Sequence, residues 1–376
     1  MKVVFVSNYF NHHQKPFCDE MYQRLGSDFS FISTSVMREE RKKLGYGQDR
    51  PPEYVLLAYE DAQKRREALE RINGADMVIA GSAPNDMLLD RIRAGKLLLR
   101  YAERPFKKKA SLLKRLYYSV KLHKDNLWKK NIYMLCASAY ASGDYRSMGL
   151  YRGRTYKWGY FPEVKEYDMD ALMQQKKRNV LMWCGRFIDW KHPDDAIKLA
   201  QKLKAAGYDF CLHFVGTGVM EEEMRQLAEK WDLTDRIKFL GSMPPDQVRK
   251  YMEETGIYVF TSDRQEGWGA VLNEAMNSGC AVVASHAIGS VPYLIKDGEN
   301  GLIYPSGDVD ALFEKVKYLM DHPDAQMLVG SKAYRTVTET WNAKTAADRV
   351  MRLTESILMG NDTDLFANGP CSRAET

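Results

Sequence analysis

Residues 256–276 read GIYVFTSDRQEGWGAVLNEAM, and this stretch decides the fold. Its beginning, residues 257–260, is continuously apolar, which is typical of a strand buried on both faces of a parallel sheet. A polar turn with Gly267 and Gly269 follows, and apolar residues then return at helical spacing. A buried strand, a turn and a helix in this order form the repeating unit of α/β folds.

The same alternation of strand-length apolar runs and helical patterns extends in both directions from this stretch. We expect strands over residues 2–7, 29–34, 54–58, 76–80, 97–101 and 132–137 in the first half, and over residues 179–184, 209–215, 236–240, 257–262 and 280–284 in the second. Two sets of buried strands predict two doubly wound, Rossmann-like α/β domains with parallel sheets.

The join between the two sets predicts the domain organisation. A polar stretch after Pro162 separates them, and the strand pattern restarts at Asn179. We expect an N-terminal domain over residues 1–165, a linker over 166–178 and a C-terminal domain over 179–342. For residues 343–359 we expect a helix, with packing against the N-terminal domain as one option. The polar residues 360–376 are expected to form a flexible tail.

Charge is unevenly distributed along the 376 residues. The chain has 55 Lys and Arg against 50 Asp and Glu, a net charge of +5, but residues 104–130 contain ten basic residues and one acid and therefore carry +9. The other 349 residues sum to −4, which disfavours a globally basic nucleic-acid binder.

Cysteine spacing and hydropathy predict the compartment. The closest two of the six cysteines are 27 residues apart, so the spacing of a zinc site is absent. No apolar run approaches the ~20 residues needed to cross a bilayer, and the apolar run at the N-terminus is too short for a signal peptide. We therefore expect a protein of the reducing cytoplasm.

Two carboxylates follow the strand over residues 257–260. Glu266 lies in the turn at the strand's carboxyl end, where ligands bind in open α/β sheets, and Glu274 lies roughly one turn into the helix. Gly267 and Gly269 allow a ligand to approach the backbone closely, and the amides of the helix start can bind an anion. The pattern suits a ligand with phosphate and hydroxyl groups; in the alternative, both glutamates are solvated.

Arg186 and Lys191 occupy a second strand-to-helix turn, after the strand over residues 179–184. A guanidinium and an ammonium in such a turn can hold a diphosphate. For each residue taken alone, the alternative is a solvated surface cation.

Several short motifs, taken in this order, resemble the retaining glycosyltransferases of family 4. They read GR and K at Gly185, Arg186 and Lys191, FVGTG at 214–218, FLG at 239–241, EGWGAVLNEA at 266–275, GCAVVA at 279–284 and DGENGL at 297–302. The first half, with AERP at 102–105 and YKWGYFPE at 156–163, is similar to bacterial members that build capsular or other surface polysaccharides.

The resemblance implies a GT-B fold, in which two Rossmann-like domains face each other across a cleft and the C-terminal domain binds a nucleotide-sugar donor. It implies that Arg186 and Lys191 bind the donor diphosphate, that Glu274 binds the ribose, and that Glu266 is a catalytic residue at the transferred sugar. The other donor-binding residues that it implies are Gly216, Gly218, Gly267, Trp268 and Gly269. It further implies a UDP- or GDP-linked donor and retaining transfer without a metal or cofactor, because cations and helix-start amides stabilise the departing diphosphate.

Three Asp-x-Asp triplets need consideration, because another glycosyltransferase fold uses this pattern to hold a divalent ion. The triplets at Asp168 and Asp362 lie in the expected linker and tail, where carboxylates are solvated. Asp308 precedes a helical pattern and is expected to cap it. We therefore predict no metal site.

The N-terminal half departs from the family pattern in two places. His12 and His13 stand in the turn after the first strand in place of a glycine-rich turn, and Glu103 lies where many members have a histidine. We expect Glu103 to be an acceptor-activating base or an electrostatic stabiliser, or else to pair structurally with Arg104 or Arg100. His13 is a further catalytic candidate near the acceptor or donor sugar, and the alternative for both histidines is a solvated loop.

The basic segment over residues 104–130 predicts an amphipathic helix, because its apolar residues recur at helical spacing. These residues are Leu112, Leu113, Leu116, Tyr117 and Val120. One interpretation is a surface helix that packs on the first sheet and leaves its lysines solvated. The other is a patch for the acceptor and an anionic membrane, formed by Lys107, Lys108, Lys109, Lys114 and Arg115.

These features predict a hexosyl- or related glycosyltransferase of surface polysaccharide assembly. The expected acceptor is a saccharide on a polyprenyl diphosphate carrier, and the expected location is peripheral, on the inner face of the membrane. The alternatives are a nucleotide-sugar epimerase of the same fold and a non-catalytic nucleotide-sugar-binding partner subunit. A cofactor-dependent phosphorylase is disfavoured because it would need a Schiff-base lysine in a much longer chain.

Overall fold

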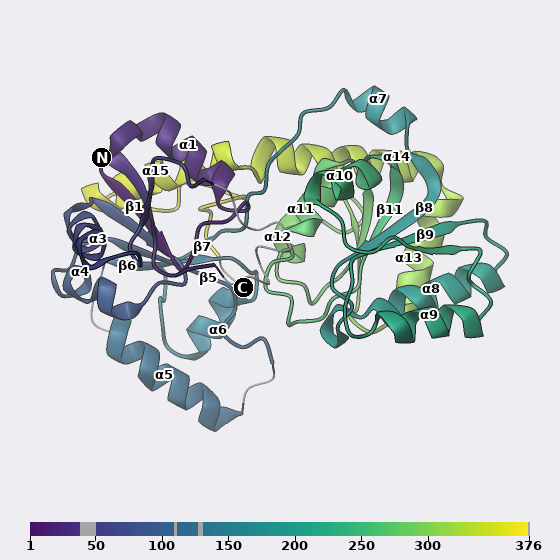
Figure 1. Cartoon of the computed structure of the whole chain (residues 1–376), viewed down its shortest axis with the longest axis horizontal. Coiled ribbons are helices and arrows are strands. Elements are labelled where there is room, and N and C mark those ends of the chain that lie inside the picture. The colour runs from purple at the N-terminus through teal and green to yellow at the C-terminus, as the bar shows by residue number, and fades with distance from the viewer. Residues whose placement is uncertain (38–49, 109–110, 127–130, 375–376) are drawn as a thin grey trace. The chain divides into compact units, whose positions relative to one another are not determined.

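The computed structural model describes residues 1–37, 50–108, 111–126 and 131–374 (Figure 1). The chain divides into two compact units, one made of Met1–Glu163 with Trp341–Thr376 and the other of Val164–Thr340. Each unit contains one sheet in which all neighbouring strands run parallel. The prediction of two doubly wound α/β domains is confirmed.

The first unit contains a seven-stranded sheet in the order β3-β2-β1-β4-β5-β6-β7. Its strands are β1 (Val3–Ser7), β2 (Phe29–Ser33), β3 (Val55–Leu57), β4 (Met77–Ala80), β5 (Leu98–Ala102), β6 (Ile132–Cys136) and β7 (Thr155–Lys157). Its helices are α1 (Lys15–Leu25), α3 (Ala62–Gly74), α4 (Leu89–Arg93), α5 (Leu112–Asn126), α6 (Ala141–Ser147) and α15 (Ala343–Met359), with short 3₁₀ turns at η1 (Gly26–Asp28) and η2 (Asn85–Leu88).

The second unit contains a six-stranded sheet in the order β10-β9-β8-β11-β12-β13. Its strands are β8 (Lys177–Cys184), β9 (Cys211–Val215), β10 (Ile237–Phe239), β11 (Thr255–Phe260), β12 (Ala281–Ser285) and β13 (Leu302–Tyr304). Its helices are α7 (Met169–Gln174), α8 (Pro193–Ala205), α9 (Glu221–Lys230), α10 (Pro245–Glu254), α11 (Val271–Asn277), α12 (Val291–Leu294), α13 (Val309–Asp321) and α14 (Pro323–Arg335), with η3 (Asp189–Lys191) and η4 (Thr336–Thr340) as short irregular turns.

Two strands were not expected from the sequence, β7 and β13. Each has three residues and lies at the edge of its sheet. β3 and β10 are edge strands of the same length that the sequence did predict, so length is not the reason. Thr155 and Lys157 are polar, and the apolar run of β13 stops at Pro305 after three residues, so neither strand forms an apolar run of the usual length.

The segment expected to be a linker, residues 166–178, belongs to the second unit. The Asn277 side chain accepts a hydrogen bond from the Lys165 amide and donates one to the Lys165 carbonyl. Tyr167 donates to Glu253 at 2.5 Å, and Lys176 donates to two backbone carbonyls inside the unit. These polar residues looked solvated in the sequence, but tertiary partners satisfy them, so the unit begins at Val164.

The C-terminal residues also differ from the expectation of a flexible tail. Cys371 donates its amide to the Lys157 carbonyl at 2.8 Å, and Ala374 donates to the Thr155 carbonyl at 3.0 Å. Cys371 and Ala374 are both 1% exposed. The described part of residues 360–376 therefore pairs with the free edge of β7, and the prediction of a flexible tail is wrong there, because an edge strand offers unpaired backbone groups. The preceding helix, α15, packs against α1 in the same unit.

Helix α5 packs on the first unit through a different face from the one that carries its five predicted apolar residues. Tyr118 and Leu122 face the core of the first unit, and Arg115 lies over the ring of Phe106. The five apolar residues, which one of the two interpretations packed on the first sheet, are exposed. Lys109 lies outside the described residues. In the part of the chain that the structure describes, no helix has the length and apolar character needed to cross a membrane.

Arg91, on α4, is a fully buried arginine that joins two loops of the first unit. Its guanidinium donates to the carbonyls of Ile72, Ala75, Asp76 and Leu97 at 2.6–3.0 Å. Burial lowers the pKa of Arg91 to about 10, partly offset by Asp76. The helix therefore depends on a polar contact that its sequence pattern does not reveal.

We predict that Arg91→Met lowers the free energy of unfolding by about 3 kcal/mol, because it leaves buried carbonyls without donors. The matched control is Arg93→Met on the same helix, where the side chain is 73% exposed and the expected change is within ~0.5 kcal/mol. Urea denaturation of both variants tests this. Equal stabilities for the two variants would contradict the structural role of Arg91.

Candidate functional site

Strands β8 and β11 lie side by side in the second sheet, and the predicted site residues follow their carboxyl ends. Arg186 and Lys191 come after β8, and Glu266 comes after β11. The Lys191 Nζ atom lies 2.5 Å from Glu266 Oε2, and these side chains are 12% and 11% exposed. The structure therefore joins two predicted site residues in a mostly buried ion pair.

Polar residues at the end of β11 hold both members of this pair. The Ser262 hydroxyl donates to Glu266 Oε2 at 3.1 Å. The Thr261 hydroxyl donates to the Lys191 carbonyl at 2.7 Å and accepts a hydrogen bond from the Trp183 indole. Neither residue had a predicted role. The strand pairing places Thr261 next to Lys191, whereas Ser262 reaches Glu266 within the same turn.

Trp190 is a further residue that the sequence did not single out. Its ring lies under both predicted cations, at 5.1 Å from Lys191 Nζ and 5.9 Å from the guanidinium carbon of Arg186. The negative face of an indole attracts cations at this range. Trp190 therefore stabilises the Lys191 ammonium and the Arg186 guanidinium at these positions. Arg186 remains exposed at the surface.

Glu274 lies on α11, close to the same strand ends. Burial raises the pKa of its carboxyl group, and the positive charge of Arg249 partly offsets this effect. Burial also raises the pKa of the Cys184 thiol to about 12. The negative charge of Glu274 adds to this increase, and the positive charge of Lys191 reduces it.

Gly216 and Gly218 have a structural role in the loop that carries Arg186. A Cβ at Gly216 would lie 2.0 Å from the Gly185 carbonyl oxygen, and one at Gly218 would lie 2.4 Å from the Phe187 carbonyl oxygen. Phe187 also donates its amide to the Thr217 carbonyl at 3.0 Å. The two glycines thus allow the turn after β9 to pack directly on the loop after β8.

Buried contacts fix the conformation of the turn over residues 267–269. Trp268 is fully buried, and its indole donates to the Asn273 side chain at 2.9 Å. Gly269 has a φ of +82°, and a Cβ there would lie 2.6 Å from the ring of Phe260. The structure therefore places Trp268 beneath the turn, while Gly267, between Glu266 and Trp268, is also buried.

In the first unit, the two predicted catalytic residues come together through a tyrosine. The ring of His13, after β1, lies nearly parallel to that of Tyr160, with 6.0 Å between centroids. The Tyr160 hydroxyl donates to Glu103 Oε1 at 2.7 Å, and His12 lies against His13. Tyr160 had no predicted role, because it is far from both residues in the sequence.

The ion pairs around Glu103 decide between its predicted partners. Lys107 lies 2.5 Å from Glu103, whereas Arg104 pairs with Asp144 at 3.1 Å. Glu103 thus pairs with a residue of the basic patch and not with Arg104, one of the two arginines named for the structural alternative. Among the other patch residues, Lys108, Lys114 and Arg115 are exposed.

Two of the three Asp-x-Asp triplets lie at helix starts, whereas the one at Asp362 follows the end of α15. Asp308 accepts a hydrogen bond from the Ala311 amide and caps α13, as predicted. Asp168 caps α7 through the amides of Asp170 and Ala171. Within the described ranges, no three His, Cys, Asp or Glu side chains are grouped so that they could hold a metal ion.

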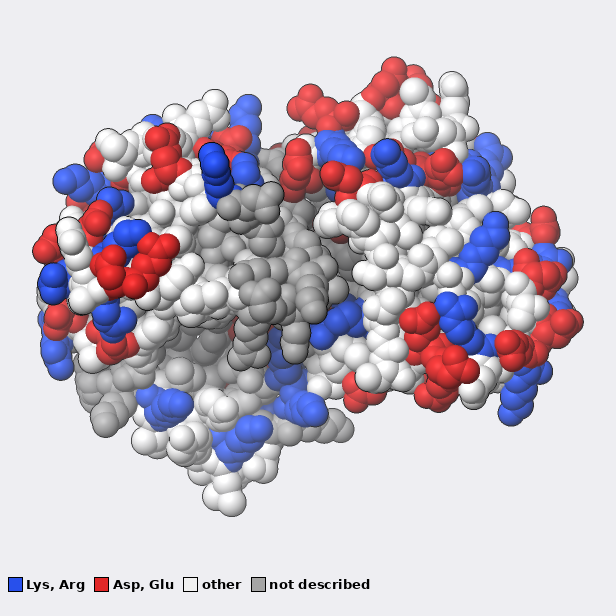
Figure 2. Space-filling view, in the orientation of Figure 1, with Lys and Arg blue, Asp and Glu red and all other residues white. Residues whose placement is uncertain are grey.

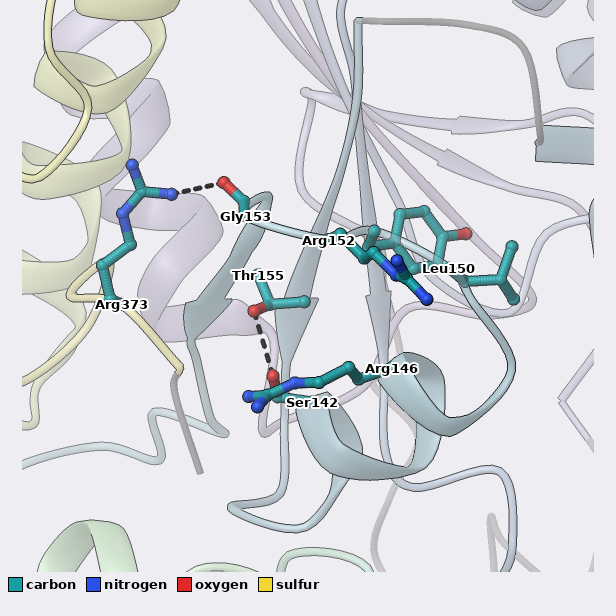
Figure 3. Close-up of a pocket in the computed structure, with 8 residues that line it drawn as sticks. Ser142, Arg146, Leu150, Arg152, Gly153, Thr155 and Arg373 are labelled. Atoms are coloured by element: carbon teal, nitrogen blue, oxygen red, sulfur yellow. Dashed lines mark hydrogen bonds between the residues drawn. The ribbon is translucent and has the colours of Figure 1, made fainter.

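A pocket of about 570 Å³ lies in the first unit, away from these residues (Figure 3). Its lining includes Arg146, Thr155 and Arg373, and the Ser142 and Thr155 hydroxyls are 3.0 Å apart. Thr155 begins β7, so the pocket is at the amino ends of the strands, whereas His13 and Glu103 follow carboxyl ends. It is therefore separate from the candidate site.

Comparison with known proteins finds similarity mainly in the second unit. Residues 164–336 match the family model described as glycosyl transferases group 1. The chain is 27% identical over 169 residues to the putative colanic acid biosynthesis glycosyltransferase WcaL of Salmonella typhimurium, covering 43% of this chain and 41% of that protein. It is 30% identical over 148 residues to the amylovoran biosynthesis glycosyltransferase AmsK of Erwinia amylovora, covering 38% and 35%. The chain thus spans less than half the length of these two relatives.

Solved structures resemble the chain over both units. Anabaena Alr3699/HepE, crystallised in complex with UDP, matches with a TM-score of 0.68 at 16% identity, over 95% of this chain and 100% of that one. A glycosyltransferase from Rickettsia africae ESF-5 matches with a TM-score of 0.67 at 14% identity, over 95% and 98%. At these identities the likeness shows the fold, which is that of GT-B glycosyltransferases.

We predict that Gly218→Ala lowers stability by about 2 kcal/mol or more, because the new methyl group would overlap the Phe187 carbonyl. The control is Gly207→Ala, where φ is +80° but nothing lies within 4 Å, so only ~1 kcal/mol of backbone strain is expected. Chemical denaturation measures both. A smaller loss at Gly218 than at Gly207 would show that the loop contact is not needed.

Proposed function

We propose, from the premise that residues 164–336 match the family model described as glycosyl transferases group 1, that the whole chain is a retaining glycosyltransferase. It would transfer a sugar from a nucleotide-diphosphate sugar to a saccharide in surface polysaccharide assembly. The observation that carries this proposal is the Lys191–Glu266 ion pair at the carboxyl ends of β8 and β11. It combines a cation for a diphosphate with a carboxylate for sugar hydroxyls in one place.

The proposed donor site uses the charges of the second unit. Lys191 and the exposed Arg186 would contact the diphosphate, and Trp190 beneath them would keep both cations in position. Glu266 holds Lys191 before the donor arrives, so the ammonium is in place without rearrangement of its long side chain. Glu274 would accept hydrogen bonds from the ribose. The expected nucleotide is UDP or GDP, and HepE was crystallised with UDP.

The proposed reaction needs charge stabilisation more than it needs a strong base. The bond from the anomeric carbon to the diphosphate oxygen breaks, and the acceptor oxygen bonds to the same carbon with retention of configuration. The acceptor proton passes to the departing diphosphate. Lys191 and Arg186 would stabilise the negative charge of this leaving group, which is the role that a metal ion fills in other enzymes. We accordingly propose transfer without a metal or other cofactor.

We assign acceptor binding to the first unit. Glu103, Tyr160 and His13 form one polar cluster after the carboxyl ends of its strands, and such groups bind saccharide hydroxyls. The names of WcaL and AmsK refer to extracellular polysaccharides, which supports a role in polysaccharide assembly for this chain as well. We propose a lipid-linked saccharide as the acceptor and a cytoplasmic location.

We predict that UDP or GDP, tested beside TDP and ADP, selectively raises the melting temperature of the chain. Arg186→Ala should weaken binding of the selected nucleotide roughly tenfold, because a charge-assisted contact is lost. The matched control is Arg178→Ala, an exposed arginine at the amino end of the same strand, which should bind normally. No shift with any nucleotide would contradict the proposed donor site.

Glu266 and Glu274 should affect different steps. Glu274→Ala is expected to weaken nucleotide binding, whereas Glu266→Gln should lower turnover by roughly 100-fold, much more than it weakens nucleotide binding through the loss of its pair with Lys191. Glu223→Gln, an exposed residue of α9, is the control. Release of the nucleoside diphosphate from the selected nucleotide sugar, with saccharide acceptors, measures turnover. Unchanged turnover in Glu266→Gln would exclude the role given to Glu266, and nucleotide binding without turnover in the unsubstituted chain would favour a binding subunit.

A further inference from the structure

The outer face of α5 carries an apolar stripe that no part of the described chain covers. Its five members are between 54% and 79% exposed, and they are Leu112, Leu113, Leu116, Tyr117 and Val120. At 100° per residue, these positions fall on one side of the helix and form a continuous surface. In the rest of the described chain, large exposed apolar residues occur singly or, at Leu358 and Met359, as one adjacent pair.

The other face of the same helix holds it firmly on the first unit. Tyr118 and Leu122 pack against the core, the Ser119 hydroxyl donates to the Met148 carbonyl at 3.1 Å, and Phe106 beneath the helix is 2% exposed. The stripe is therefore presented outward by a helix with a packed inner face. Exposed contiguous apolar surface is unfavourable in water and marks a site that another apolar surface covers.

The charges around the stripe indicate what kind of surface covers it. Lys114, Arg115 and Lys121 are exposed on α5, and Lys108 is exposed just before it. The sequence over residues 104–124 contains no Asp or Glu. In Figure 2 the described side chains over α5 are blue and white, whereas blue and red are mixed elsewhere on that face. A second copy of the chain would present the same positive charge and repel the first, whereas an anionic lipid surface complements both the charge and the stripe.

We propose that the outer face of α5 is a membrane anchor that lies in the interface of an anionic bilayer. The leucines, Tyr117 and Val120 would enter the boundary between head groups and acyl chains, while the flanking lysines bind lipid phosphates. The anchoring element is the stripe itself, with the cations of α5 in support. This differs from a purely basic patch centred on Lys107, which is paired with Glu103. The proposal rests on α5 alone and not on the proposed enzymatic activity.

The test compares paired variants of the full chain by co-sedimentation with vesicles. The vesicles contain phosphatidylcholine alone or with about one third phosphatidylglycerol. Leu113→Glu with Leu116→Glu removes the stripe, and Leu328→Glu with Leu358→Glu is the control, since these leucines are 55% and 52% exposed on other helices. Lys114→Gln with Lys121→Gln removes charge from α5, and Lys230→Gln with Lys250→Gln removes the same charge elsewhere. Circular dichroism verifies that each variant is folded.

We expect binding to the anionic vesicles only, weakened by salt, with both control variants binding like the unsubstituted chain. The stripe variant should lose roughly tenfold or more in partitioning, and the lysine variant should lose its preference for phosphatidylglycerol. Absence of vesicle binding, or equal binding by the stripe variant and its control, overturns the proposal. Concentration-dependent dimers that the stripe variant abolishes would also overturn it, in favour of self-association through α5.

Discussion

The lateral pairing of β8 with β11 is the constraint on which the candidate donor site depends. Ile257 pairs with Leu181 and Tyr258 with Met182, so the two strands end at the same edge of the sheet. This pairing brings Lys191 within 2.5 Å of Glu266, although 75 residues separate them. Gly256 permits the register shift at the start of the pair, because a Cβ there would lie 2.8 Å from the Lys177 carbonyl oxygen.

In the first unit the site residues also follow the carboxyl ends of strands, but these strands are not adjacent. His13 follows β1 and Glu103 follows β5, and β4 lies between these two strands. Two such side chains are too far apart to meet as neighbours on adjacent strands. Tyr160, after β7, bridges them with a long aromatic side chain, stacking on one and hydrogen-bonding to the other. An edge strand thus contributes to a cluster whose other members follow more central strands.

Local patterns predicted well wherever local interactions decide the outcome. The cap at Asp308 depends on amides within one helical turn, and most of the buried strands depend only on their own apolar residues. The structural roles of Gly216 and Gly218 could not be predicted from local patterns. At each position a carbonyl group of another loop leaves no room for a Cβ atom. The polar residues around Lys176 suggested a linker for a related reason, since their partners are carbonyls distant in the sequence.

The sequence by itself determined that the chain forms two doubly wound sheets and that Arg186, Lys191 and Glu266 follow the carboxyl ends of strands. These properties come from the periodicity of apolar residues, which is local. Only the tertiary structure decided that Lys191 pairs with Glu266, that Tyr160 joins His13 to Glu103, and that the apolar stripe of α5 faces outward. Helical spacing shows that a stripe exists, but its direction depends on which face of the helix finds a partner, and that follows from the packing of the whole unit.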